Sequence, residues 1–138
     1  MITLEPRKTE EILQDLEKGK RIFLIGCSGW KTLCNPGGEV QLQRLKGELE
    51  LKGVPVTGTL VLDALCNKGM DELSLFRHFR QVLGSDFLLA MSCEVGVQAL
   101  WATAGRMIVP ALRTTSVEGF QGGWKEKEAC RLCGDCFL

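Results

Sequence analysis

The sequence of 138 residues contains no tyrosine and a single histidine, His78. Histidine and tyrosine are among the side chains that enzymes use most often to move protons, so their scarcity argues against a chain organised for acid–base catalysis. His78 stands between Arg77 and Phe79 in a segment with helical periodicity. We therefore interpret it as a core-edge or solvent-facing residue rather than a metal ligand or catalytic base.

The chain also has no excess of positive or negative charge, and it contains no apolar run long enough to span a bilayer. Lys plus Arg and Asp plus Glu both number 17, which removes the general electrostatic attraction that nucleic acids or anionic membranes exert on basic proteins. The first residues show no apolar core of a signal peptide. We expect a cytoplasmic protein that neither binds nucleic acid nor spans a membrane.

Cysteine, in contrast, is abundant, with seven residues. Cytoplasmic thiols are kept reduced, so a dense and odd-numbered set predicts metal binding or redox chemistry rather than a disulfide framework.

Apolar runs and helical patterns alternate along the first three quarters of the chain. Segment 21–26 is apolar from Ile22 onward and is bounded by charge and glycine, which is typical of a strand buried on both faces. The alternation predicts an α/β fold, a single doubly wound and mainly parallel sheet of about four strands with helices on both faces. The expected helices are 6–18, the segment from the turn at 35–38 to Gly53, 70–83 and 97–104; the expected strands are 21–26, 54–62, 86–91 and 106–109.

Two of these helices carry apolar stripes that we expect to face the core. They are Val40, Leu42, Leu45 and Leu49 in the first case, and Leu73, Phe76, Phe79 and Leu83 in the second. Segment 114–124 is rich in glycine and threonine without periodicity, so we expect a loop there. We therefore divide the chain into an α/β domain, 1–113, and a loop with a cysteine-rich metal-binding tail packed on it, 114–138.

Three cysteines stand at or just beyond the ends of expected strands: Cys27, Cys66 and Cys93. The carboxyl ends of parallel strands share one edge, where open α/β folds bind ligands, so these thiols and Cys34 from the first loop are expected on one rim. The alternative is a purely structural role, in which each cysteine is a small hydrophobic residue packed at a strand end.

The tail carries three further cysteines in the spacing C-x2-C-x2-C: Cys130, Cys133 and Cys136. This spacing is compatible with a [4Fe–4S] cluster or a zinc site, and either requires a fourth ligand. Two ligand sets are open. The four rim cysteines form one site and the tail another, or one rim cysteine completes the tail triad.

The sequence resembles the C-terminal domain family associated with methylenetetrahydrofolate reductase, a small cysteine-rich accessory subunit in acetogenic bacteria. The resemblance rests on Ile25–Gly26–Cys27, Cys34 with Gly37–Gly38–Glu39, the stretch from Met91 to Gln98, and the stretch from Cys130 to Cys136. It implies an accessory subunit with an iron–sulfur centre that contacts the flavin-dependent reductase, all seven cysteines being ligands or their neighbours. Trp30 stands where family members typically have another cysteine, and the sequence ends at Leu138 where they usually continue.

Three functions follow as hypotheses. The first is an electron-transfer or assembly subunit without catalysis of its own, and the second is a structural zinc-binding interaction module. The third is an enzyme with Cys27 as nucleophile, activated by backbone amides of the following helix.

Overall fold

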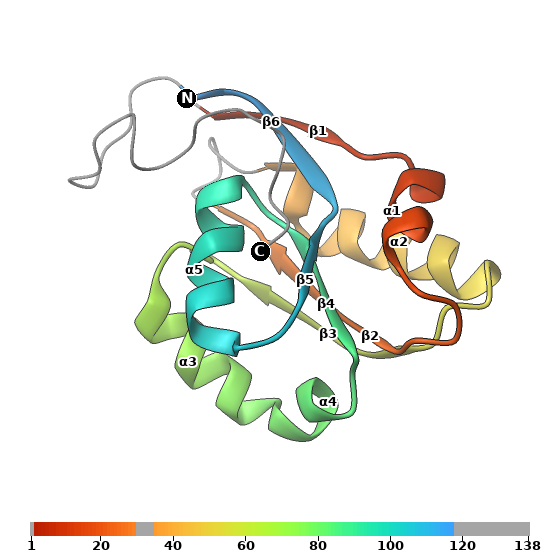
Figure 1. The fold of residues 1–138 in the computed structure, drawn as a ribbon. Coiled ribbons are helices and arrows are strands. Elements are labelled where there is room, and N and C mark those ends of the chain that lie inside the picture. The colour runs from red at the N-terminus through yellow and green to blue at the C-terminus, as the bar shows by residue number, and fades with distance from the viewer. Residues whose placement is uncertain (1, 30–34, 118–138) are drawn as a thin grey trace.

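The computed structural model describes residues 2–29 and 35–117 of the 138-residue chain. Strands and helices alternate through most of it (Figure 1). In order, the elements are β1 Ile2–Pro6, α1 Thr9–Asp15, β2 Ile22–Cys27, the 3₁₀ turn η1 Asn35–Gly37, α2 Glu39–Leu51, β3 Val56–Leu62, α3 Lys68–Arg77, α4 Phe79–Leu83, β4 Phe87–Met91, α5 Glu94–Ala104, β5 Ile108–Pro110 and β6 Leu112–Val117.

The central sheet is parallel and has the strand order β3-β2-β4-β5. The chain leaves β2 for β3 on one side and then crosses to β4 on the other, so strand order reverses between β2 and β4. In open α/β sheets the crevice outside the carboxyl ends of such a pair is the usual ligand site. In this chain those ends are Cys27 of β2 and Met91 of β4.

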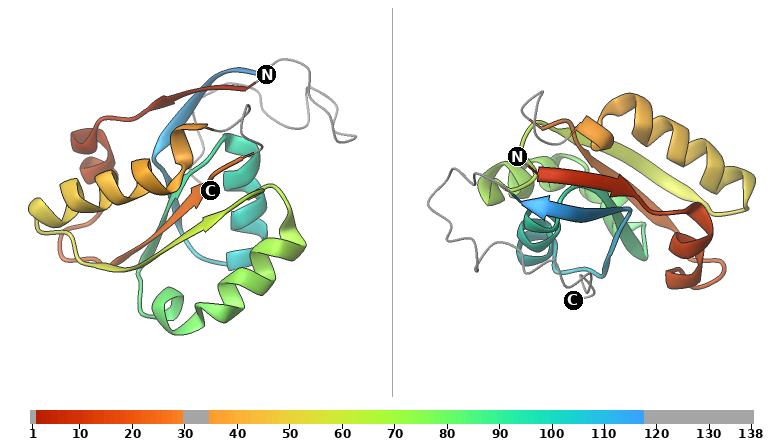
Figure 2. Two further views of the ribbon diagram at one scale, coloured as in Figure 1. Left: turned by 180° about the vertical axis from the view of Figure 1, so that it is seen from behind. Right: turned by 90° about the horizontal axis from the view of Figure 1, so that it is seen from above.

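Helices cover both faces of this sheet (Figures 1 and 2). Successive side chains of a strand point to opposite faces, and β2 and β4 are buried along their whole length. One core contains Phe23 and Leu88 together with residues of α3, α4 and α5, and the other contains Leu24 and Leu89 together with residues of α1 and α2. The predicted parallel sheet with helices on both faces is confirmed.

A second sheet, which the sequence did not predict, pairs the two ends of the described chain. Strands β1 and β6 lie antiparallel, with Glu5 opposite Arg113 and Pro6 opposite Leu112 (Figure 2, right). The expected loop is therefore wrong for 114–117, which form the end of β6. The expected first helix is shorter than 6–18, because Pro6 ends a strand and α1 begins at Thr9.

The predicted helix 70–83 is also wrong in two respects. It is two helices, α3 and α4, separated at His78. Its expected core stripe points outward, whereas Leu75 and Val82 are buried; the exposed fractions are 54% for Leu73, 74% for Phe76, 47% for Phe79 and 62% for Leu83. In α2, Leu42, Leu45 and Leu49 are buried as predicted, but Val40 is exposed.

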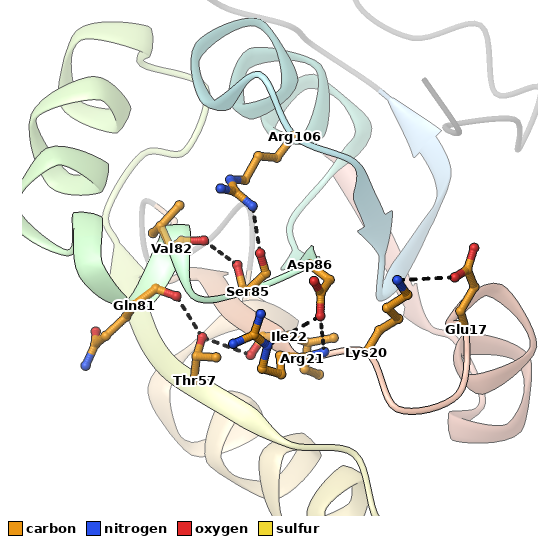
Figure 3. Close-up of polar contacts among 10 residues, drawn as sticks. All are labelled: Glu17, Lys20, Arg21, Ile22, Thr57, Gln81, Val82, Ser85, Asp86 and Arg106. Atoms are coloured by element: carbon orange, nitrogen blue, oxygen red, sulfur yellow. Dashed lines mark hydrogen bonds and ion pairs between the residues drawn. The ribbon is translucent and has the colours of Figure 1, made fainter.

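The amino-terminal edge of the parallel sheet is fixed by a set of satisfied polar contacts (Figure 3). The backbone N–H of Arg21 donates to Asp86 at 2.8 Å, which lowers the pKa of that carboxyl from its ordinary value. Thr57 of β3 donates to a carbonyl oxygen of α4 at 2.9 Å, and Arg106 donates to the Ser85 carbonyl at 2.6 Å. These contacts tie β2, β3 and the segments flanking β4 together, far from the edge that carries the thiols.

Candidate functional site

The three described cysteines follow the carboxyl ends of three neighbouring parallel strands. Cys27 is the last residue of β2, Cys66 lies between β3 and α3, and Cys93 is the N-cap of α5 immediately after β4. Cys27 and Cys93 are buried, with exposed fractions of 4% and 5%, and Cys66 is exposed. Burial of Cys27 disfavours the hypothesis that it is a nucleophile, because a substrate must reach the sulfur.

Four predicted site residues lie outside the described part of the chain: Cys34, Cys130, Cys133 and Cys136. Their assignment as ligands stays a prediction, as does the metal-binding role of the segment that follows Val117.

The thiols at this edge influence one another electrostatically. Although Cys66 is exposed as a residue, partial desolvation of its thiol raises the pKa above the ordinary value, and negative charge at Cys93, Cys27 and Asp71 raises it further. Three thiolates near one another repel unless a cation lies among them, so the described arrangement keeps Cys66 protonated at neutral pH. A bound metal ion would reverse this preference, since it stabilises the thiolate form.

Asp71, in the first turn of α3, is a site residue that sequence reasoning missed. Its side chain has an exposed fraction of 0%, and neither carboxylate oxygen has a hydrogen-bond partner within the described residues. Burial, and then negative charge at Cys27, raises the pKa of Asp71 to about 7. Asp71 stands at helical spacing with Leu75, His78 and Val82, which form the core-facing stripe. This stripe is less apolar in sequence than the stripe of Leu73, Phe76, Phe79 and Leu83, so hydrophobic periodicity alone does not select it.

Further polar atoms are buried at the start of α5. Ser92 Oγ and Glu94 Oε2 have no hydrogen-bond partner within the described chain, whereas Glu94 Oε1 accepts from the Thr114 N–H at 2.8 Å. In return, Thr114 Oγ1 accepts from the Glu94 N–H at 3.4 Å. This reciprocal pair of hydrogen bonds holds β6 beside Cys93. Val117, the last described residue, is three positions after Thr114.

The crevice between β2 and β4 is filled by the chain itself. Gly37 of η1 packs so tightly on the strand ends that a methyl group at its Cα would overlap the Met91 carbonyl oxygen and lie 2.7 Å from that of Cys27. A side chain at Gly26 would overlap the Gly37 carbonyl oxygen. The backbone of the segment before α2 therefore covers the carboxyl ends of β2 and β4.

A pocket of about 390 Å³ lies on the other face of the sheet, between α1 and α2. Arg7, Thr9, Arg44 and Glu48 line it, and Met91 forms part of its floor. Three of its charged groups already have partners: Thr9 donates to Glu48 at 2.7 Å, Glu48 pairs with Arg44, and Arg7 donates to an aspartate of α1 at 2.6 Å. The pocket and the thiol group thus belong to different faces.

His78 lies at the core edge, as predicted. Its Nδ1 lies 2.9 Å from the Ser74 carbonyl oxygen, which can only accept, so the imidazole proton of that bond is on Nδ1. Its ring packs 6.3 Å from that of Phe23. This environment explains His78 as a structural residue at the junction of α3 and α4.

Within residues 2–29 and 35–117, no group of three or more histidine, cysteine, aspartate or glutamate side chains is placed to hold a metal ion. In the same ranges no helix is long and apolar enough to cross a membrane. Comparison with protein-family models, curated proteins and solved structures found no match to the chain.

Proposed function

We propose that this protein is a cysteine-ligated metal-binding subunit of the cytoplasm. It carries an iron–sulfur centre, with zinc as the alternative, and relays electrons to, or assembles with, a flavin-dependent methylenetetrahydrofolate reductase. The subunit has no catalysis of its own. The partner and the iron–sulfur assignment come from the family resemblance described above, and the metal-binding role is supported by residues at the sheet edge.

One observation carries the metal-binding role. Cys27, Cys66 and Cys93, separated by up to 66 positions in sequence, follow three adjacent strand ends, and Asp71 is buried close enough to Cys27 for charge to act between them. A buried carboxyl without a hydrogen-bond partner costs free energy, and a cation at this edge would remove that cost. The donor set of soft thiolates with one oxygen group fits iron–sulfur or zinc ligation.

The missing donors are the cysteines outside the described residues. Cys34 is three positions before Gly37, which packs on the carboxyl ends of β2 and β4. Cys130, Cys133 and Cys136 belong to the segment that begins after β6, whose Thr114 is bonded beside Cys93. Both ligand sets remain compatible with these anchor points: two separate sites, or one site that combines the tail with a single rim thiol.

The chain's own residues suit electron relay better than catalysis. Cys27 and Cys93 are buried among apolar side chains such as Leu65, which excludes water from the ligand sulfurs. Exclusion of water and the charges near the sulfurs are factors that set the reduction potential of such a centre. An iron–sulfur group bound there would supply one-electron transfer.

Anaerobic purification followed by iron, acid-labile sulfide and zinc analysis tests the proposal. We expect iron and sulfide in equal amounts. With two separate sites, Cys66→Ser and Cys133→Ser should each lose about half of both. With one combined site, Cys133→Ser should lose most of both, and Cys66→Ser should do so only where Cys66 is the rim ligand. Ser28→Ala, at the same edge and next to Cys27, is the matched control and should keep its metal. Colourless protein with zinc and no iron would instead establish the structural zinc module, and metal content unchanged in Cys133→Ser would remove the tail from the site.

The partner is tested separately, by mixing the metal-loaded chain with a purified flavin-dependent methylenetetrahydrofolate reductase. Co-elution, together with reduction of the flavin by the pre-reduced chain, is the expected result. Co-elution without electron transfer would support assembly alone. Independent elution with intact iron–sulfur content would reject this partner and leave the metal-binding role in place.

A further inference from the structure

The pocket between α1 and α2 has the size and the position of a ligand site. Its volume of about 390 Å³ is in the range of small-molecule pockets. Its lining includes Met91, the last residue of β4, and Ala111, which directly follows β5. Open α/β sheets bind ligands at such carboxyl strand ends, beside the point where strand order reverses. The crevice at that point is covered by Gly37, and the neighbouring Pro36 lines the pocket, so a ligand would lie next to the covered crevice.

The inner wall of the pocket is apolar and is part of the core. Four lining residues are buried members of the core that α1 and α2 form with the sheet: Ile12, Leu45, Met91 and Ala111. Walls of this kind bury the apolar body of a small molecule, and a methionine side chain adapts its shape to what it contacts. We therefore expect a ligand with an apolar portion.

Hydrogen bonds within the chain hold the rim of the pocket in place. Thr9 donates to Glu48 Oε2 at 2.7 Å, which joins α1 to α2. Arg7 donates from Nη1 to the Pro110 carbonyl oxygen at 2.8 Å and from its backbone N–H to the Ala111 carbonyl oxygen at 3.0 Å. A rim that is ordered before binding loses little conformational freedom when a ligand enters.

The charges of the lining residues leave one positive charge uncompensated. Arg7 pairs with Asp15 at 2.6 Å. Arg44 pairs through Nε with Glu48 at 3.3 Å, and its Nη groups can still donate to a ligand. Lys8 is the third cation of the lining and has no ion-pair partner within residues 2–29 and 35–117. One surplus positive charge suits a monoanion, because the Glu48 carboxylate would repel a second negative charge on the ligand.

We propose that this pocket binds a small carboxylic acid with an apolar body. The carboxylate lies at Lys8 and Arg44, and the apolar body lies against the buried inner wall. A carboxylate is a monoanion at neutral pH, and its planar shape matches the guanidinium group. The inference does not depend on the metal-binding role, because the pocket and the thiols lie on different faces of the sheet.

Isothermal titration calorimetry of the full chain with octanoate and with octanol tests the ligand class. The two probes share an aliphatic body and differ in charge. We expect one octanoate per chain, bound about tenfold more tightly than octanol or better. Absence of saturable octanoate binding, or equal affinity for the two probes, would overturn the proposal.

A pair of lysine variants tests the position of the carboxylate. Lys8→Gln should weaken octanoate binding about fivefold or more and leave octanol binding unchanged, because only the charged probe loses a partner. Lys52→Gln, at the C-cap of α2 and outside the pocket lining, is the matched control and should bind both probes like the wild type. Equal weakening of octanoate by both variants would show general charge attraction and reject a site at Lys8.

A pair of glutamine variants tests the position of the apolar body. Gln41 is exposed and lines the pocket, so Gln41→Trp should obstruct it and weaken octanoate binding about tenfold or more, with an unchanged far-UV circular dichroism spectrum. Gln43→Trp, two positions further along α2 and outside the lining, is the control and should keep wild-type affinity. Wild-type affinity in Gln41→Trp would place the octanoate site elsewhere and overturn the proposal.

Discussion

Asp71→Asn is expected to stabilise the metal-free protein strongly at alkaline pH and hardly at all at acid pH. The ordinary carboxyl pKa of 3.8 is raised in the folded state to about 7, so the folded chain holds this proton more tightly than the unfolded chain. Stability is therefore complete below the unfolded pKa and falls as pH rises toward 7, where the ionised carboxylate is forced into a buried site. A difference of about three pKa units corresponds to roughly 4 kcal/mol, an upper figure for the effect above pH 7.

Urea unfolding between pH 4 and pH 8 in the presence of a metal chelator measures this effect. The wild-type free energy of unfolding should decline over that range, while that of Asp71→Asn should decline less and exceed it at pH 8. Glu10→Gln, which neutralises an exposed carboxyl in the first turn of α1, is the control and should follow the wild type. If the free energy of unfolding depends on pH in the same way for wild type and Asp71→Asn, Asp71 is not a buried carboxyl without a hydrogen-bond partner.

The parallel sheet was predictable because its signal is local. Segment 21–26 is apolar at nearly every position, and all residues of β2 are indeed buried. Burial of a strand on both faces requires helices on both faces, so this one run already implied the layer arrangement. The positions of Cys27, Cys66 and Cys93 followed from the same reasoning, since each comes at or soon after the end of a recognisable strand.

The second sheet could not be predicted because its signal is not local. Glu5 and Arg113 are paired although more than a hundred positions separate them. Neither β1 nor β6 is strongly apolar, and the threonine-rich segment of β6 also suits a loop. Its strand conformation depends on its partner and on the bonds between Thr114 and Glu94, which only the folded chain brings together.

The orientation of α3 shows a different limit of sequence patterns. Periodicity revealed a stripe through Leu73 and Phe76 but not the direction in which it points. The core side of α3 is formed by Leu75 and, at its start, by Asp71, whose carboxyl would ordinarily be assigned to the solvent face. The buried carboxyl of Asp71 and the exposed rings of Phe76 and Phe79 thus violate the usual rule of burial.

Gly37→Ala is expected to destabilise the fold by about 3 kcal/mol or more, because the new methyl group has no space. It would overlap the Met91 carbonyl oxygen and lie 2.7 Å from the Cys27 carbonyl oxygen, both of which belong to the backbone of the central sheet. These atoms cannot rotate away as a flexible side chain could. Either η1 lifts from the ends of β2 and β4 or the strands separate, and each alternative loses packing at the centre of the molecule.

A second glycine substitution provides the control, because Gly47 lies in α2 and a methyl group on its Cα would point into open space, with no neighbouring side chain within 4 Å. Gly47→Ala should stabilise the protein by about 0.5–1 kcal/mol, since alanine loses less backbone entropy in a helix than glycine does. In urea unfolding at fixed pH, the two Gly→Ala substitutions, ten residues apart, should therefore change the free energy of unfolding in opposite directions. Equal effects at the two positions would mean that η1 does not seal the crevice between β2 and β4, and that this crevice is open to a ligand.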